Sequence, residues 1–142
     1  MRKFLLNSAL LGLVTLGGAG PALAAMDVSA DHGSVWQTKK IGDTTQGFLQ
    51  IHNTGAADDV LTAWSCPVAD TTELVGADGK PLQSLTIPAG QTVTLSGTGV
   101  HLLLESTHDT VDFGSVVPCS FTLQNTGDIA VYLNAVPAPA AN

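Results

Sequence analysis

One histidine of this sequence stands where it could bind a metal ion. His101 lies inside the apolar segment 100–104, whose composition predicts a β-strand. Side chains alternate between the two faces of a strand, so Leu103 is the same-face neighbour of His101. A donor at position 103 would complete a two-ligand metal clip, but leucine carries no donor atom. His101 is therefore a candidate metal ligand, with a purely structural strand histidine as the alternative.

The other three histidines give weaker signals. His52 is expected at the end of a strand, on the surface of the protein. His32 and His108 stand beside Asp31 and Asp109 in polar segments, and we expect both to be solvated loop residues. Exposed histidines of this kind are more often surface groups than ligands, so none of the three is predicted to bind metal.

The two cysteines, Cys66 and Cys119, are an even count in a chain that we expect to be exported. In an oxidising compartment this favours a disulfide. Two buried free thiols and a metal-binding thiolate remain as alternatives.

No pattern typical of an enzyme is present. There is no glycine-rich phosphate loop, and no serine has a motif that would support a catalytic triad. The only glutamates, Glu73 and Glu105, are not paired in sequence with a second carboxylate. The sequence therefore predicts a protein without enzymatic activity.

The first 24 residues are typical of a secretory signal peptide. Arg2 and Lys3 precede the largely apolar segment 4–16, and Ala-Leu-Ala at 22–24 is a small-residue cleavage site. The alternative, a membrane anchor, is disfavoured because the apolar segment is shorter than the ~20 residues that span a bilayer. No cysteine lies near the cleavage site, so a lipid anchor is not expected. We predict cleavage after Ala24 and export to the periplasm.

The remaining chain is acidic and long enough for one domain. Lys39, Lys40 and Lys80 are its only lysines or arginines, against 12 acidic residues. Such a charge repels nucleic acid and anionic lipid, so neither is an expected partner. We predict one monomeric domain over residues 25–136 and a disordered tail over residues 137–142.

Seven to nine short apolar segments, separated by Gly, Asn and Pro turns, predict an antiparallel β-sandwich or barrel. Segments 91–95 and 100–104 are predicted to form a hairpin, with Val100, Leu102 and Leu104 in the core. Residues 27–34 read as a lead-in or a first edge strand. Asp-Gly at 78–79 predicts a tight turn.

Six segments, taken in order, resemble the periplasmic copper chaperone family PCuAC. Residues 48–55, 66–69, 72–74, 85–93, 99–104 and 117–123 are similar to that family's AYMTITNTG, SPVA, VEL, LPIPAGGTV, GYHLMLM and VPVTLTF. The resemblance covers nearly all of the predicted domain. It implies an all-β, cupredoxin-like antiparallel β-sandwich with Greek-key topology.

The resemblance also implies a copper site, most of whose ligands are missing here. The family pattern is a His, a Met and then a His-x-Met pair. His101 matches the second His, whereas Val75, Gly79 and Leu103 stand at the other three positions, and the segment from 75 to 79 is shorter than in the family. Soft thioether and imidazole ligands select Cu(I), and Met26 is the only methionine left after signal cleavage.

Two functions follow as expectations. The first is a periplasmic copper chaperone-like protein that binds or delivers Cu(I) through a degenerate site containing His101. Its implied partner is a copper-accepting protein, with cytochrome oxidase assembly as the family's role. The alternative is a metal-free β-sandwich module that binds a protein partner.

Overall fold

The computed structural model describes residues 27–140, which form nine β-strands and no helix. The strands are β1 (Val28–Trp36), β2 (Thr45–Asn53), β3 (Asp59–Ser65), β4 (Ala69–Val75), β5 (Leu85–Ile87), β6 (Thr92–Thr94), β7 (His101–Thr107), β8 (Val116–Leu123) and β9 (Gly127–Val136). No membrane-spanning helix is found among these residues. The predicted signal peptide, residues 1–24, and Met26 lie outside the described range.

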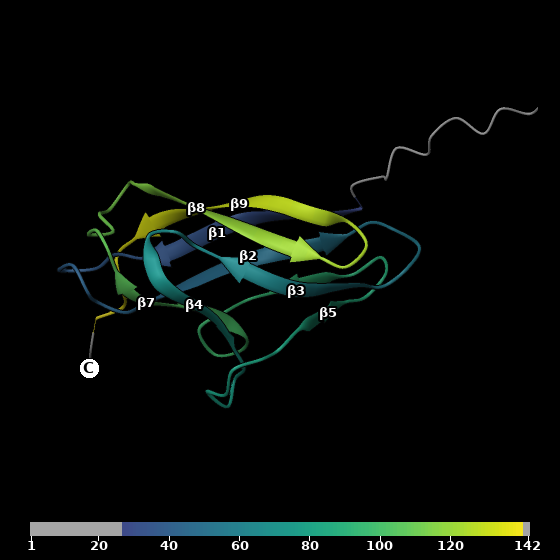
Figure 1. Ribbon diagram of the computed structural model, residues 1–142, viewed down its shortest axis with the longest axis horizontal. Helices are drawn as coiled ribbons and strands as arrows, with labels where there is room; N and C mark the ends of the chain where they lie inside the picture. The colour runs from purple at the N-terminus through teal and green to yellow at the C-terminus, as the bar shows by residue number, and fades with distance from the viewer. Residues whose placement is uncertain (1–26, 141–142) are drawn as a thin grey trace, which may run out of the picture.

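The nine strands form one continuous, curled sheet (Figure 1). Their order is β4-β7-β2-β1-β9-β8-β3-β5, and β6 pairs with β2 beside this path. Every pair is antiparallel except β1 with β9, which run parallel through residues 34–36 and 134–136. The predicted cupredoxin-like β-sandwich is confirmed. The parallel pair, which joins the two halves of the sandwich, corrects the expectation of a purely antiparallel sheet.

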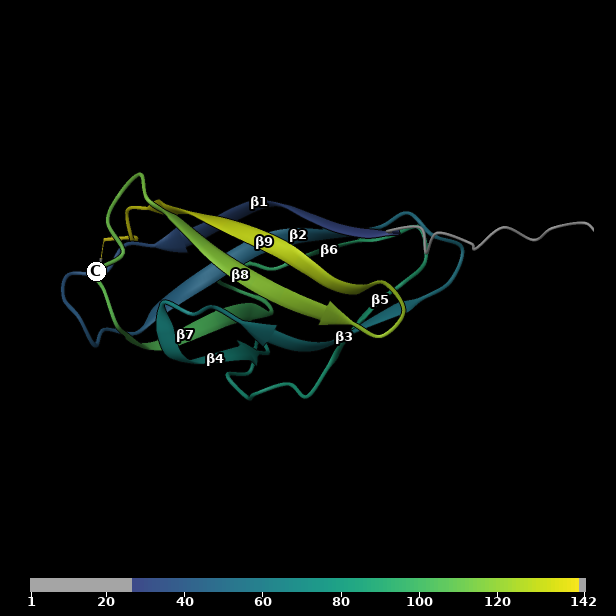
Figure 2. The ribbon, with the colours of Figure 1, turned by 45° about the horizontal axis from the view of Figure 1, so that its top comes forward.

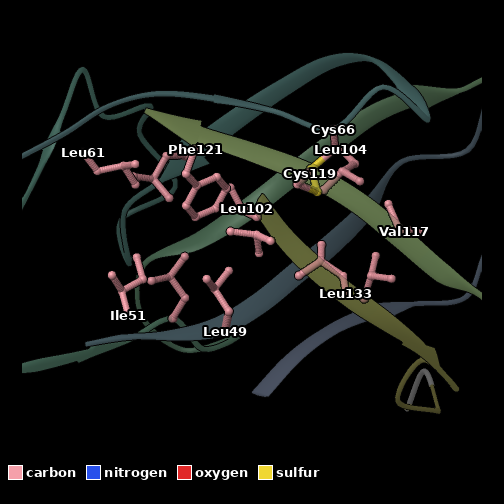
Figure 3. Packing of buried hydrophobic residues seen from close by; sticks show 14 of the residues in the cluster. Leu49, Ile51, Leu61, Cys66, Leu102, Leu104, Val117, Cys119, Phe121 and Leu133 are labelled. Carbon is pink, nitrogen blue, oxygen red and sulfur yellow. A yellow bond between two sulfur atoms is a disulfide. The ribbon is translucent and has the colours of Figure 1, made fainter. Parts of the chain in front are cut away.

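The core lies between the two halves of the curled sheet. Figure 3 shows Phe121 of β8 and Leu61 of β3 facing Leu49 and Ile51 of β2 across a common apolar space. Burial alternates strictly along β2, β8 and β9, as it must when one face of a strand packs and the other meets solvent. Each fully buried Leu, Ile or Phe contributes about 1.5–3 kcal/mol.

Strand β7 positions His101. Leu102 and Leu104 are fully buried, and the residues between and beside them, His101, Leu103 and Glu105, are only partly buried. The predicted alternation is therefore confirmed. Val100 differs from the expectation, because it packs against the core without being fully buried.

The predicted hairpin of residues 91–95 and 100–104 does not form. β6 pairs with residues 50–52 of β2, and β7 pairs with residues 45–47 of the same strand. The two segments therefore pair with β2 one after the other, like a single interrupted strand. In Figure 2, β6 lies beside β2 and β7 lies below it. Residues 96–100 loop out, closed by a hydrogen bond from the Ser96 N–H to the Val100 carbonyl oxygen. The local turn residues predicted a reversal of the chain, but the register with β2 prevails.

Strand β1 is not the edge strand that its small polar residues suggested. It lies inside the sheet, between β2 and β9. Its pairing with β2 is interrupted by a bulge between Asp31 and Ser34. A Cβ atom on Gly33 would collide with the carbonyl oxygen of Tyr132 in β9. The close approach of β1 and β9 at this bulge therefore requires glycine, and a propensity for isolated strands cannot reveal that.

Candidate functional site

His101 is held in a defined orientation at the start of β7. Its Nδ1 atom lies 2.9 Å from the carbonyl oxygen of Gly99. A carbonyl oxygen only accepts hydrogen bonds, so Nδ1 carries the ring proton and donates it. The lone pair of the neutral ring is then on Nε2. This is the arrangement of metal-binding histidines, whose other ring nitrogen is usually anchored by a backbone carbonyl or a carboxylate.

Aromatic packing supports the ring of His101. Its centroid lies 6.3 Å from that of Phe48 in β2. Phe48 in turn packs edge to face against Trp36 of β1, with centroids 5.1 Å apart. A Cβ atom on Gly97 would lie 3.7 Å from the Phe48 ring, so the loop of residues 96–99 closes over this aromatic group. His101 is therefore packed as well as hydrogen-bonded, and its ring has little freedom to turn.

The strand neighbours of His101 provide hydrocarbon rather than donor atoms. Val75 of β4 is its direct partner across the ladder, and Glu73 is the partner of Leu103. Directly opposed residues share a face, so Val75 and Leu103 both flank His101. Val75 is buried and Leu103 is partly buried. Two of the positions that the PCuAC resemblance assigns to ligands are thus close to His101 in the ladder but carry no donor.

The loop after β4 is a closed tight turn. The Gly79 N–H donates to the Gly76 carbonyl oxygen, and the Gly76 N–H donates to that of Lys80, both at 2.9 Å. Gly79 has φ +80°, which confirms the predicted Asp-Gly turn. The Asp78 carboxylate accepts the Lys80 N–H at 3.0 Å and so belongs to the turn itself. This loop brings no free donor side chain to His101.

Among residues 27–140, no group of three or more His, Cys, Asp or Glu side chains is placed so that it could hold a metal ion. His101 alone stands at a ligand position of the family pattern. The four-ligand Cu(I) site of the resemblance therefore does not fit the residues present, because three of its positions hold carbon and hydrogen only.

The predicted disulfide is confirmed. Cys66, directly after β3, is bonded to Cys119 of β8, and the bridge spans 53 residues of sequence. Both cysteines are buried, and Figure 3 shows the yellow sulfur bond at the edge of the core beside Leu104. Because these are the only cysteines of the sequence, free thiols and a thiolate metal ligand are excluded in this oxidised state.

A second polar cluster, which the sequence did not predict, lies across β1, β2 and β6. Oδ1 of Asp31 lies 2.7 Å from Nδ1 of His32 and 2.7 Å from Nε2 of His52. On its other side, Nδ1 of His52 lies 2.8 Å from Oγ1 of Thr92. Hydrogen bonds from His32 and then from His52 lower the pKa of Asp31 despite some opposing burial. His32 is solvent-exposed as expected but lies in β1 rather than in a loop, and His52 lies at the end of β2 as expected. Sequence analysis did not foresee that both contact one carboxylate.

No local signal in the sequence could have revealed this cluster, because the residues meet only through the β1–β2 and β2–β6 registers. His108 is an exposed residue of the loop after β7, as expected. Its Nε2 contacts the carboxylate of Asp70, 38 residues away, rather than that of its neighbour Asp109. Both residues are exposed, and the contact ties the loop after β7 to β4.

A cavity of about 290 Å³ opens between β3 and β4. It is lined by Thr62, Trp64, Thr72, Glu73, Leu74, Pro81, Leu82 and Gln83. Glu73 is the only charged side chain among them. The cavity lies where β4, at one end of the sheet, approaches β3 near the other end.

Comparison with known proteins identifies the family of this chain and proteins that share its fold. The model of a family described as "Putative lipoprotein LpqE-like" matches residues 24–135. The copper-bound PCuAC domain from PmoF2 superposes with a TM-score of 0.70 at 16% identity, covering 80% of this chain and 94% of that domain. The apo PCuAC domain from PmoF1 gives 0.69 at 16% identity, covering 79% and 95%.

A third solved structure is that of Cu(I)-DR1885 from Deinococcus radiodurans. It gives a TM-score of 0.62 at 19% identity, covering 80% of this chain and 82% of that one. A comparison with curated proteins gives no match. The structural likenesses agree with the expected PCuAC fold, and the family match covers most of the sequence. This chain therefore belongs to the LpqE-like family and has the fold of PCuAC domains.

Proposed function

We propose that this protein is an exported copper-binding protein of chaperone type, with a degenerate family site in which His101 is the remaining ligand. The observation that carries the proposal is the anchored ring of His101, whose Nε2 lone pair is free at the position of a family ligand. Support comes from the fold, which is shared with PCuAC domains whose structures are described as copper-bound.

The surroundings of His101 make this a weak site for Cu(I). High affinity for Cu(I) comes from several soft donors fixed around one ion. Here the neighbours in the ladder are Val75 and Leu103, so one imidazole acts nearly alone. A weakly held ion is released readily to a partner with a complete ligand set. We therefore propose transfer to a copper-accepting protein, with cytochrome oxidase assembly as the role implied by the family, and no enzymatic reaction.

Export to the periplasm is part of the proposal. It is supported by the signal-peptide pattern of residues 1–24 and by a disulfide, which forms and persists in oxidising compartments. Both cysteines of the sequence are in that bridge. We therefore propose that neither thiol carries a lipid, although the family is described as one of lipoproteins.

The test is a competition titration with Cu(I), using untagged protein that begins at residue 25. It is done without oxygen and with ascorbate, and a thiol assay confirms that the disulfide stays intact. We expect weak binding, with affinity reduced at least ~10-fold by His101→Ala. Met26→Leu controls for the one thioether. Binding that is unchanged in His101→Ala would overturn the proposed site. No Cu(I) binding by the wild type would favour the metal-free module instead.

A further inference from the structure

We propose that the cavity between β3 and β4 binds the arginine side chain of an extended peptide segment from a partner protein. Three segments line this cavity: β3, β4 and residues 81–83. Its volume of about 290 Å³ is at the small end of the range for ligand pockets, so it has room for one side chain and not for a larger ligand. The proposal goes beyond the function proposed above, because it involves no metal ion and does not use His101.

A bulge in β3 places Trp64 at this cavity. The β3–β8 register shifts between Leu61 and Ala63, so that Trp64 stands opposite Phe121. Without this shift Trp64 would stand opposite Ser120, on the other face of the strand. Phe121 is fully buried and directly opposed residues share a face, so Trp64 lies on the core-facing side of β3. Its ring packs partly against the core and also lines the cavity, where it forms a fixed aromatic wall.

Glu73 provides the only negative charge among the residues that line the cavity. It is partly buried and pairs with Leu103 on the outer face, so it lies at the outer rim of the cavity. The salt bridges found among the described residues all involve histidine, and none includes Glu73. A carboxylate and an indole ring around one small cavity suit a guanidinium group, which forms paired hydrogen bonds with carboxylate oxygens and stacks on aromatic faces. The net charge of −7 also attracts a cation.

The open edge of β4 offers contacts to a peptide backbone. β4 ends the sheet, and β7 is its only strand partner. The carbonyl oxygen of Leu74 accepts the N–H of Leu82, so the backbone groups of Leu74 point away from β7. Backbone groups alternate in direction along an antiparallel strand, so those of Thr72, two residues earlier, point the same way. No backbone partner is found for them within residues 27–140. An extended peptide pairs with an edge of this kind.

Two contacts hold the cavity in shape before a ligand arrives. The Cys66 N–H donates to Oγ1 of Thr72 at 3.1 Å, and the disulfide ties Cys66 to Cys119 of β8. These contacts fasten β4 to the end of β3, and such a preformed site loses little freedom on binding. Leu82 already occupies the edge at Leu74, so a peptide has only a short length of edge to pair with. We therefore expect a weak contact that is dominated by one side chain.

The test uses the capped tripeptide acetyl-Gly-Arg-Gly-amide, titrated into untagged, oxidised protein that begins at residue 25. Amide NMR shifts of the wild type locate the contact, and we expect them to change at residues 62–64 and 72–74. Trp36→Phe leaves Trp64 as the only tryptophan, so the fluorescence of that variant reports on the cavity directly. We expect a dissociation constant on the order of 1 mM, as suits a contact made by one side chain.

Charge is tested on both sides of the contact. Glu73→Gln removes the negative charge with little change in side-chain size and should weaken binding at least ~5-fold. Glu105→Gln is the matched control, since it removes the only other glutamate, which lies on β7 outside the cavity, and it should leave binding unchanged. In the probe, citrulline is the neutral isostere of arginine and should weaken binding at least ~5-fold, whereas lysine should weaken it less. Thermal unfolding confirms that each variant is folded.

Four results would overturn the inference. They are no binding of the tripeptide by the wild type, amide shifts that cluster away from the cavity, binding that Glu73→Gln leaves unchanged, and equal binding of the citrulline peptide. Free butylguanidinium is the last probe, because it carries the charge of the side chain without a peptide backbone. We expect it to bind more weakly than the tripeptide. Equally tight binding would overturn the contact with the β4 edge, and with it the assignment of the cavity to a protein partner.

Discussion

Val75 and His101 are direct partners across the β4–β7 ladder, so the imidazole at the candidate copper site faces a buried hydrocarbon side chain. In the family pattern both positions carry histidine. In this chain the position opposite His101 holds a side chain without a donor atom. The same holds for Leu103, which shares the outer face with His101 and is the partner of Glu73.

Leu103→Met is the most informative repair of that site. It nearly conserves volume, so its cost in folding free energy should stay below ~1.5 kcal/mol. It places a thioether on the face of His101 and should raise Cu(I) affinity modestly, as measured by competition titration. Leu102→Met is the matched control, since residue 102 points into the core. An equal gain in both variants, or no gain in Leu103→Met, would contradict the face assignment.

The alanine variants at residues 101 and 102 should differ sharply in their free energy of unfolding. Leu102 is fully buried, so Leu102→Ala should lower the free energy of unfolding by ~2–5 kcal/mol. His101→Ala removes one hydrogen bond to a backbone carbonyl and partial packing on Phe48, and should lower it by only ~0.5–1.5 kcal/mol. Urea denaturation of both variants checks this. A loss at residue 101 as large as at 102 would make His101 primarily a structural residue.

The disulfide should contribute substantially to stability. It closes a long loop and joins the end of β3 to β8, so the double variant Cys66→Ala/Cys119→Ala should lose about 2–5 kcal/mol. Chemical denaturation of wild type and variant at pH 7 measures the difference. Alkylation of unfolded, unreduced wild-type protein is the companion assay. Two modified thiols in that assay would show that the bridge is absent from the exported protein.

Asp59 should make stability depend on acid pH. Burial opposes its ionisation, but hydrogen bonds from the Thr126 hydroxyl and from three backbone N–H groups outweigh it and lower its pKa. A carboxyl whose pKa is lowered by folding stabilises the protein above its unfolded pKa of about 4. That stabilisation is lost as the pH falls through the folded pKa.

Asp59→Asn is the variant for this test, with unfolding by urea measured from pH 7 to pH 3. The amide cannot accept at both positions, so the variant should be less stable at pH 7 by roughly 1–3 kcal/mol. Its stability should also fall less steeply with acid than that of the wild type. Parallel curves for the two proteins would show that another carboxyl carries the dependence.

Local sequence patterns predict where a strand lies better than they predict which strands pair with it. Alternating residues correctly place β7 and the face of β7 that bears His101, because periodicity is a property of one strand. The failed hairpin at residues 96–99 shows what periodicity omits: two adjacent segments can both pair with a third strand. The even number of cysteines favoured a disulfide, but only the fold brings Cys66 and Cys119 into contact.

His101 and the cluster of Asp31, His32 and His52 also differ in how far the sequence could predict them. His101 was found because it lies within one strand segment, together with the residues that flank it. The contact of Asp31 with His52 depends on the β1–β2 register, which shifts at a bulge where Gly33 lies against β9. No window of sequence contains all of these residues. Long-range pairing, rather than residue preference, determines that cluster.

The parallel pairing of β1 with β9 has a consequence for how the domain is made. The first strand is completed on that side by the last one, so the sheet cannot close until nearly the whole chain is available. During synthesis from the N-terminus, β1 can pair with β2 early, but its other edge stays unpaired until residues 134–136 are made. Contacts of such long sequence separation slow folding. The sheet of the nascent domain thus stays incomplete until its final strand is available.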